Sequence, residues 1–146
     1  MGDGSKSHRN VPKKIVDSNV TACAAGERHS LFVKNDGSLW AMGQNHKGQL
    51  GDGTNTDRTS PVKIVDQNVT AVSAGQYYSL FLKNDGSVWS MGFNGRFRLG
   101  IGTDGDRNVP TLVMASGAVA IESGIAHSLI LKSDGSLWAL GTEGNG

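Results

Sequence analysis

A 14-residue pattern that occurs three times constrains this chain more than any other feature. The copies span residues 30–43, 79–92 and 128–141, each 49 residues after the last, with no insertion between them. Every copy contains Asp-Gly-Ser-x-Trp. Self-similarity at a period of about 20–50 residues is typical of solenoids and propellers. The repeat therefore says much about architecture and little about function, because no catalytic motif accompanies it.

Each unit is expected to form four short strands, described here for the first copy. Residues 31–33 are apolar without alternation, as in a strand covered on both faces. Asp36-Gly37 predicts a tight hairpin turn, because glycine accepts the positive φ that such a turn requires. Residues 39–42 form the return strand. A strand of small residues at 20–24 comes before this hairpin, and a proline-marked strand at 61–65 comes after it.

The character of the first and last strands indicates the architecture. Small side chains suit an inner strand near a crowded axis, and proline belongs at a sheet edge because it has no N–H to donate. Four strands of this kind make one blade of a propeller. We therefore predict an all-β protein: a β-propeller of four-stranded blades, with about three blades in a single segment of residues 1–146.

Three segments of the first unit carry a family resemblance. They are Gly26-Glu-Arg-His-Ser-Leu, Asp36-Gly-Ser-Leu-Trp-Ala-Met-Gly and Asn45-His-Lys-Gly-Gln-Leu-Gly-Asp-Gly-Thr. These segments resemble the repeat of the regulator of chromosome condensation family. The second unit departs from the signature, with Tyr78 in place of His, Phe97 in place of Gly and Arg98 in place of Gln. The resemblance implies a propeller, usually of seven blades, and a role in binding proteins; the family's nucleotide-exchange activity maps to no residue here.

The repeat boundaries suggest how three blades could close a ring. The units are residues 20–68, 69–117 and 118–146, the last completed by residues 1–19 of a neighbouring chain. Residues 11–16 of one copy are expected to supply the outer strand of the blade begun by residues 118–141 of another. Two copies would then form a closed homodimer of six blades, and a homotrimer of nine blades is the alternative. The residues expected at this joint are Val11, Pro12, Ile15, Val16, Leu137 and Trp138.

The loops that join strands one and two, and those that follow strand three, vary strongly between units. They should share one face of the propeller, whereas the Asn-Asp-Gly hairpins lie on the other face and hardly change. Aromatic residues and arginine are enriched in binding hot spots. The candidate partner-binding residues on this variable face are Glu27, Arg28, Tyr77, Phe93, Arg96, Phe97 and Arg98. Loop drift, or use of Phe97 to pack a subunit joint, is the alternative explanation.

No catalytic or metal-binding set emerges from the sequence. The His-Ser pairs at residues 29–30 and 127–128 recur with the repeat, which favours a structural role over nucleophilic catalysis. Residues 52–57 lack the full ligand series of a calcium loop. We predict a non-enzymatic, protein-binding scaffold without cofactor or metal. The alternatives are a fragment or minimal propeller with an assembly role only, or an enzyme with a site at the channel mouth.

Composition adds expectations about environment and core. The formal charge of +1 provides no strong field for nucleic acid or an anionic membrane. Neither a signal peptide nor a membrane span is recognisable, so a soluble, cytoplasmic protein is expected. The single cysteine, Cys23, is predicted to be a buried free thiol. Trp40, Trp89 and Trp138 are expected in the core, with the first two packed between blades.

Overall fold

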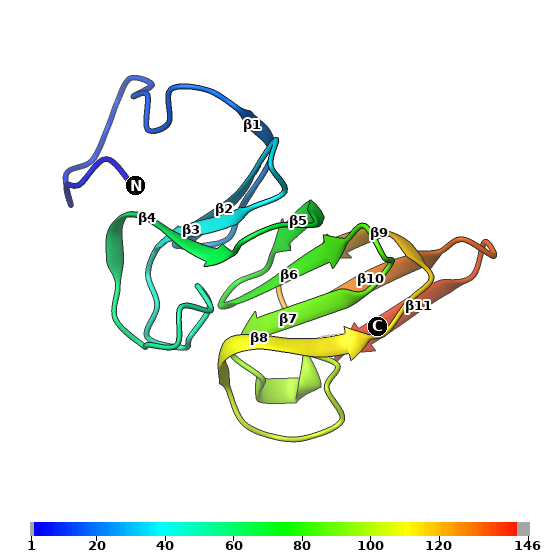
Figure 1. Cartoon of the computed structure of the whole chain (residues 1–146). Coiled ribbons are helices and arrows are strands. Elements are labelled where there is room, and N and C mark those ends of the chain that lie inside the picture. Colours follow the sequence, from blue (N-terminus) through cyan, green and yellow to red (C-terminus); the bar gives the residue numbers. More distant parts are fainter. Residues whose placement is uncertain (1, 143–146) are drawn as a thin grey trace.

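The computed structural model describes residues 2–142, which form eleven strands in three antiparallel sheets (Figure 1). The first sheet contains β1 (Val20–Ala25), β2 (His29–Lys34), β3 (Leu39–Gly43) and β4 (Arg58–Val65). The second contains β5 (Val69–Ala74), β6 (Tyr78–Lys83), β7 (Val88–Gly92) and β8 (Arg107–Met114), with the short 3-10 helix η1 (Gly95–Phe97) between β7 and β8. The third contains β9 (Ala118–Ser123), β10 (His127–Lys132) and β11 (Leu137–Gly141).

Each sheet is a meander in which neighbours in sequence are neighbours in space. The order is β1-β2-β3-β4 in the first sheet and β5-β6-β7-β8 in the second, so the four-stranded blade is confirmed twice. The proline-marked strands β4 and β8 lie at sheet edges, as predicted. The third sheet has the three strands β9, β10 and β11. Residues 11–16 pair with no strand in the described part of the chain.

The Asp-Gly-Ser-x-Trp pattern builds the hairpin of each sheet. The N–H of Gly37, which has φ +76°, donates to the carbonyl oxygen of Lys34 at 2.9 Å. The Asp36 carboxylate accepts from the backbone N–H and the hydroxyl of Ser38, at 2.9 and 2.6 Å. The Ser38 hydroxyl in turn accepts from the indole N–H of Trp40 at 2.9 Å. The same tryptophan-to-serine bond recurs in the other two sheets, which explains why these residues repeat together.

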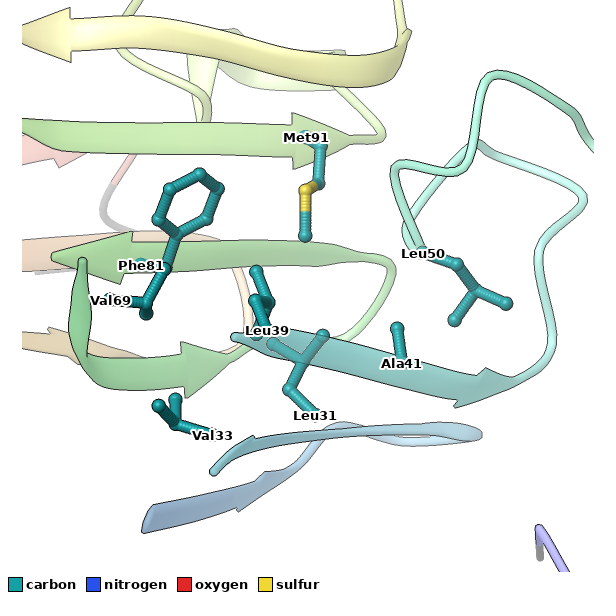
Figure 2. Packing of buried hydrophobic residues seen from close by; sticks show 8 residues of the cluster. All are labelled: Leu31, Val33, Leu39, Ala41, Leu50, Val69, Phe81 and Met91. Carbon is teal, nitrogen blue, oxygen red and sulfur yellow. The ribbon is translucent and has the colours of Figure 1, made fainter. Parts of the chain in front are cut away.

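The sheets pack face to face through two apolar cores. The core between the first and second sheets consists of Leu31, Val33, Leu39, Ala41, Leu50, Val69, Phe81 and Met91 (Figure 2). The core between the second and third sheets consists of Tyr78, Leu80, Leu82, Val88, Leu99, Ala118, Ile121 and Ile130. Because side chains on a strand alternate between its two faces, strands of the second sheet contribute to both cores. The strands of small residues lie innermost, with β1 against β5 and β5 against β9.

The N-terminal segment packs on the first sheet. The loop between the third and fourth strands of each complete sheet packs in the same way on the sheet that follows. The N–H of Gly4 donates to the carbonyl oxygen of Thr59 at 2.9 Å, and Gly53 makes the matching bond to Asn108 at 2.8 Å. Three matching glycines lie against the third strand of the following sheet: Gly2 against Met42, Gly51 against Met91, and Gly100 against Leu140. Residues 2–5 therefore occupy the place of a loop from a preceding blade.

The prediction that Cys23 is buried is wrong. Its thiol is free and exposed. Cys23 lies on the face of β1 that has no preceding sheet against it, whereas the matching Ile121 is buried. This position faces the preceding sheet. It is therefore buried at Ile121, which has such a sheet against it, and exposed at Cys23, which has none.

The predicted packing of the tryptophans holds for only one of them. Trp89 packs against the core between the first two sheets and stacks on Phe81 with ring centroids 6.3 Å apart. Trp40 stacks in the same way on Phe32 at 6.2 Å, but on the uncovered face of the first sheet, where it is half-buried. Trp138 is 52% exposed, because no fourth strand lies beside β11 within the described residues.

Candidate functional site

The variable loops of each blade are joined at their bases. The N–H of Gln44 donates to the carbonyl oxygen of Arg28 at 2.8 Å, and Phe93 makes the same bond to Tyr77 at 2.8 Å. Each bond links the loop after the third strand to the loop between the first two strands. Both loops therefore open on one edge of their blade, and we call this edge, with residues 27–28, 44–47, 76–77 and 93–98, the variable face.

A first cluster on the variable face bridges two blades. The Tyr77 hydroxyl lies 3.5 Å from the Oε1 atom of Glu27, and the His46 ring meets the Tyr77 ring edge-on at 5.4 Å between centroids. The Glu27 carboxylate also lies 3.7 Å from the Arg28 guanidinium. The structure thus brings together three of the residues predicted from the sequence and adds His46. The signal that could have found His46 is its place in a loop that changes between units.

A second cluster surrounds Phe93. The Lys47 ammonium lies 4.8 Å from the Phe93 ring centroid, and the Arg98 guanidinium lies 4.7 Å from it. Arg98 is buried, with its Nε donating to the Gly95 carbonyl oxygen at 2.9 Å and its head 5.8 Å from the Tyr78 ring. Burial lowers the pKa of the Arg98 guanidinium. Arg98 therefore supports the loop from beneath and offers little of its own surface to a partner.

The turn at Arg96 and Phe97 has a strained backbone. Both residues have positive φ, 66° and 57°, in the left-handed region that non-glycine residues rarely occupy. Phe97 stands at the position of Gly48, which has φ +77° in the first blade. Its side chain is 58% exposed. Strained backbone of this kind clusters at functional sites, so Phe97 remains a candidate site residue.

Polar contacts join the blades beside the apolar cores. The Nε2 of His29 lies 2.8 Å from the Ser79 hydroxyl, which itself donates to the Gln49 carbonyl oxygen at 2.8 Å. Burial lowers the pKa of His29 to about 4. At the next joint the Tyr78 hydroxyl replaces the imidazole and lies 2.9 Å from the Ser128 hydroxyl. His29 of the first His-Ser pair therefore bonds across two sheets, whereas His127 of the last pair is exposed in the single chain.

A hollow of about 420 Å³ lies where the inner strands end. Its lining includes the three matching glycines Gly26, Gly75 and Gly124. Among the described lining residues, Glu27 is the only titratable one. A lone carboxylate supplies no acid–base pair. Among residues 2–142, no group of three or more histidine, cysteine or acidic side chains is placed to hold a metal ion.

Two buried asparagines organise the variable loops, and sequence reasoning missed them. The Asn45 side-chain N–H group donates to the Asp52 carboxylate at 3.0 Å, and its oxygen accepts from the Leu50 N–H at 2.9 Å. Asn94 repeats the second contact with Leu99 at 3.1 Å. Their recurrence at the 49-residue period is the signal that could have found them.

The two segments expected at a subunit joint, residues 11–16 and β11, lie at opposite ends of the row of sheets (Figure 1). Val11, Pro12 and Ile15 are exposed, and Val16 is half-buried. Leu137 and Trp138 are exposed on β11. A single chain therefore does not bring the two groups together. No helix within residues 2–142 is long and apolar enough to cross a membrane.

The radial sheets and their repeated joints define a segment of a β-propeller. Two family models agree, both described as the regulator of chromosome condensation (RCC1) repeat. One matches residues 36–82 and 85–131, and the other matches residues 20–49 and 69–97. The chain belongs to the RCC1 repeat family.

Solved structures of the same fold are considerably longer. Human WBSCR16 is 27% identical over 97% of this chain and 39% of its own, with a TM-score of 0.79. Prp20p from Saccharomyces cerevisiae is 22% identical over 94% of this chain and 38% of its own, with a TM-score of 0.82. That structure was described together with the binding of Prp20p to Gsp1p and histones, and a further structure shows yeast RCC1 (Prp20) with Kap60 bound. This chain thus spans about two fifths of their length, and no curated protein matches it.

Proposed function

We propose that the chain is a non-enzymatic scaffold that binds another protein through its variable face. The observation that carries the proposal is Phe97, an exposed aromatic side chain on a left-handed backbone. Backbone strain of this kind clusters at binding and switch regions, which supports a binding role for this turn. Tyr77 and Phe93 extend the same face with further aromatic surface, flanked by basic side chains. Such composition suits a protein partner.

Two further findings support a binding role over an enzymatic one. The inner hollow, where a channel-mouth active site would lie, holds the single carboxylate of Glu27 among its described lining residues. The related propeller Prp20p is described by its binding to Gsp1p and histones. Protein binding is therefore the activity that this family's architecture offers most directly.

We also propose that two copies of the chain close a six-bladed ring with two-fold symmetry. Three blades leave two blade faces uncovered, and an uncovered sheet edge promotes association. Leu137 is 63% exposed, whereas the matching Leu39 and Val88 are fully buried. Closed symmetric rings satisfy such faces without leaving an open end.

The binding role is tested by affinity capture with the Tyr77→Ala/Phe97→Ala double variant. A matched control, Asn35→Ala/Asn84→Ala, changes exposed residues on the opposite hairpin face. The proposal expects proteins captured by the parent and by the control to be lost with the double variant. Equal capture by all three folded proteins would rule out this face and leave the purely structural alternative.

A further inference from the structure

We infer that residues 9–16 of one copy form the fourth strand of the third sheet in a second copy, in one defined register. The inference rests on the proposed ring closure and adds which groups meet at the joint. The partner is a second copy of this chain, because the chain already makes the same contact twice within itself.

The two complete sheets show how a fourth strand pairs with a third strand. In the first sheet β4 and β3 pair as Val65–Leu39, Lys63–Trp40, Val62–Ala41 and Arg58–Gly43. In the second sheet β8 and β7 repeat these pairs 49 positions later, as Met114–Val88, Leu112–Trp89, Thr111–Ser90 and Arg107–Gly92. Applied to the third sheet, the pattern gives Val16–Leu137, Lys14–Trp138, Lys13–Ala139 and Arg9–Gly141 between the two copies.

The donated segment already lies on the sheet that it would help to cover. Ile64 and Val65 of β4 pack against the core between the first and second sheets. The matching Ile15 and Val16 line an apolar hollow of about 340 Å³ on the uncovered face of the first sheet, together with residues of β1, β2 and β3. The segment therefore has the position of an outer strand, and β9–β11 of a second copy would supply its missing neighbours.

The two uncovered faces are the two halves of one contact. On the last sheet, Leu131 is 39% exposed, whereas the matching Leu82 is 5% exposed. On the first sheet, Val20 is 42% exposed, whereas the matching Val69 is 3% exposed. Each exposed residue thus has a buried counterpart at an internal joint, so bringing the faces together would reproduce a core that this sequence already forms.

The polar contacts of the internal joints predict matching contacts at the new one. His29 bonds to Ser79 and Tyr78 bonds to Ser128, so His127 of one copy should bond to Ser30 of the second. His127 is exposed in the single chain.

The loop contact continues in the same way. The N–H groups of Gly4 and Gly53 donate to Thr59 and Asn108, so the N–H of Gly102 should donate to the carbonyl oxygen of Asn10 of the second copy.

Disulfide trapping tests the register in the 146-residue chain. The variant Lys13→Cys/Ala139→Cys, in a Cys23→Ala background, should form a covalent dimer under mild oxidation, seen on a non-reducing gel. Both positions are exposed, so the changes leave the fold intact. The control Thr111→Cys/Ser90→Cys places the same pair inside the second sheet and should link within one chain. The control Lys14→Cys/Ala139→Cys is shifted by one residue, which turns one side chain to the other face, and should not link.

The outcomes separate this inference from the ring closure itself. A covalent dimer from the in-register pair alone supports the joint as described. A dimeric mass for the unlinked parent, with trapping only by the shifted pair or by neither, overturns the register and leaves closure to be explained by another joint. A monomeric mass without trapping overturns both, and further repeats in a longer chain would then be the natural cover for the two faces.

Discussion

The Nε2 atom of His29 and the hydroxyl of Ser79 lie 2.8 Å apart across the joint between the first two blades. The bond lies beside the apolar core of this joint, where an unpaired buried polar group would be costly. At the next joint Tyr78 and Ser128 make the equivalent contact. One position therefore joins successive blades with either of two side chains, and burial lowers the pKa of the histidine to about 4.

Stability should fall as the pH is lowered from about 6.5 to about 4. Burial lowers the pKa of His29 from 6.5 to about 4, so the unfolded chain takes up a proton in this range while the folded chain does not. The full contribution is present above pH 6.5, and up to about 3 kcal/mol is lost on the way down. Urea unfolding at a series of pH values measures this. His29→Tyr, which introduces the residue type found at Tyr78, should remove most of the slope; an unchanged slope would show that another group is responsible.

Trp89→Ala should lower the free energy of unfolding by about 3 kcal/mol, because its ring packs against the core between two blades. Thermal or urea unfolding measures the loss. Trp138→Ala is the matched comparison at an exposed position. Trp138→Ala should lower the free energy of unfolding by about as much as Trp89→Ala only if a second copy covers β11. A small loss at Trp89 would contradict the blade packing.

The Cys23 thiol should react with a thiol reagent at a rate that rises on dilution. Cys23 is exposed in the single chain, whereas the matching Ile121 is buried beneath a preceding blade. Ring closure would cover Cys23 in the same way, and dissociation would uncover it. Labelling in urea gives the rate for a fully accessible thiol. If native protein reacts at that rate at every concentration, no second copy covers this face.

Phe97→Gly should stabilise the fold by about 1 kcal/mol, because glycine relieves the cost of the left-handed backbone. The reverse test is Gly48→Ala, which should destabilise, because a side chain there meets the Asn108 backbone and φ is +77°. Chemical unfolding measures both. Because Gly48 lies against Asn108, the proposed joint would bring Phe97 close to Asn10 of a second copy. If Phe97→Gly dissociates an oligomer, Phe97 serves that joint rather than the binding of another protein.

The repeat makes the blade predictable from sequence, because each Asp-Gly turn marks a hairpin and its flanks must be strands. The errors at Cys23 and Trp40 share one cause: both occupy positions suited to burial, but a periodic sequence does not reveal which unit lacks a neighbour. Arg98 is a different case, since its loop position predicts a surface residue, yet its head lies against the Phe93 ring and is buried. The Tyr78–Ser128 contact is hidden because tyrosine takes the place of histidine in the repeat.

Ring closure by two copies is tested most directly by the mass of the 146-residue chain in solution. Light scattering across a concentration series should give about twice the chain mass of 15.3 kDa, falling toward one chain only at high dilution. A mass of three chains would indicate a nine-bladed ring and contradict closure by two. A folded protein with the mass of a single chain at every concentration would contradict closure by copies of this chain altogether.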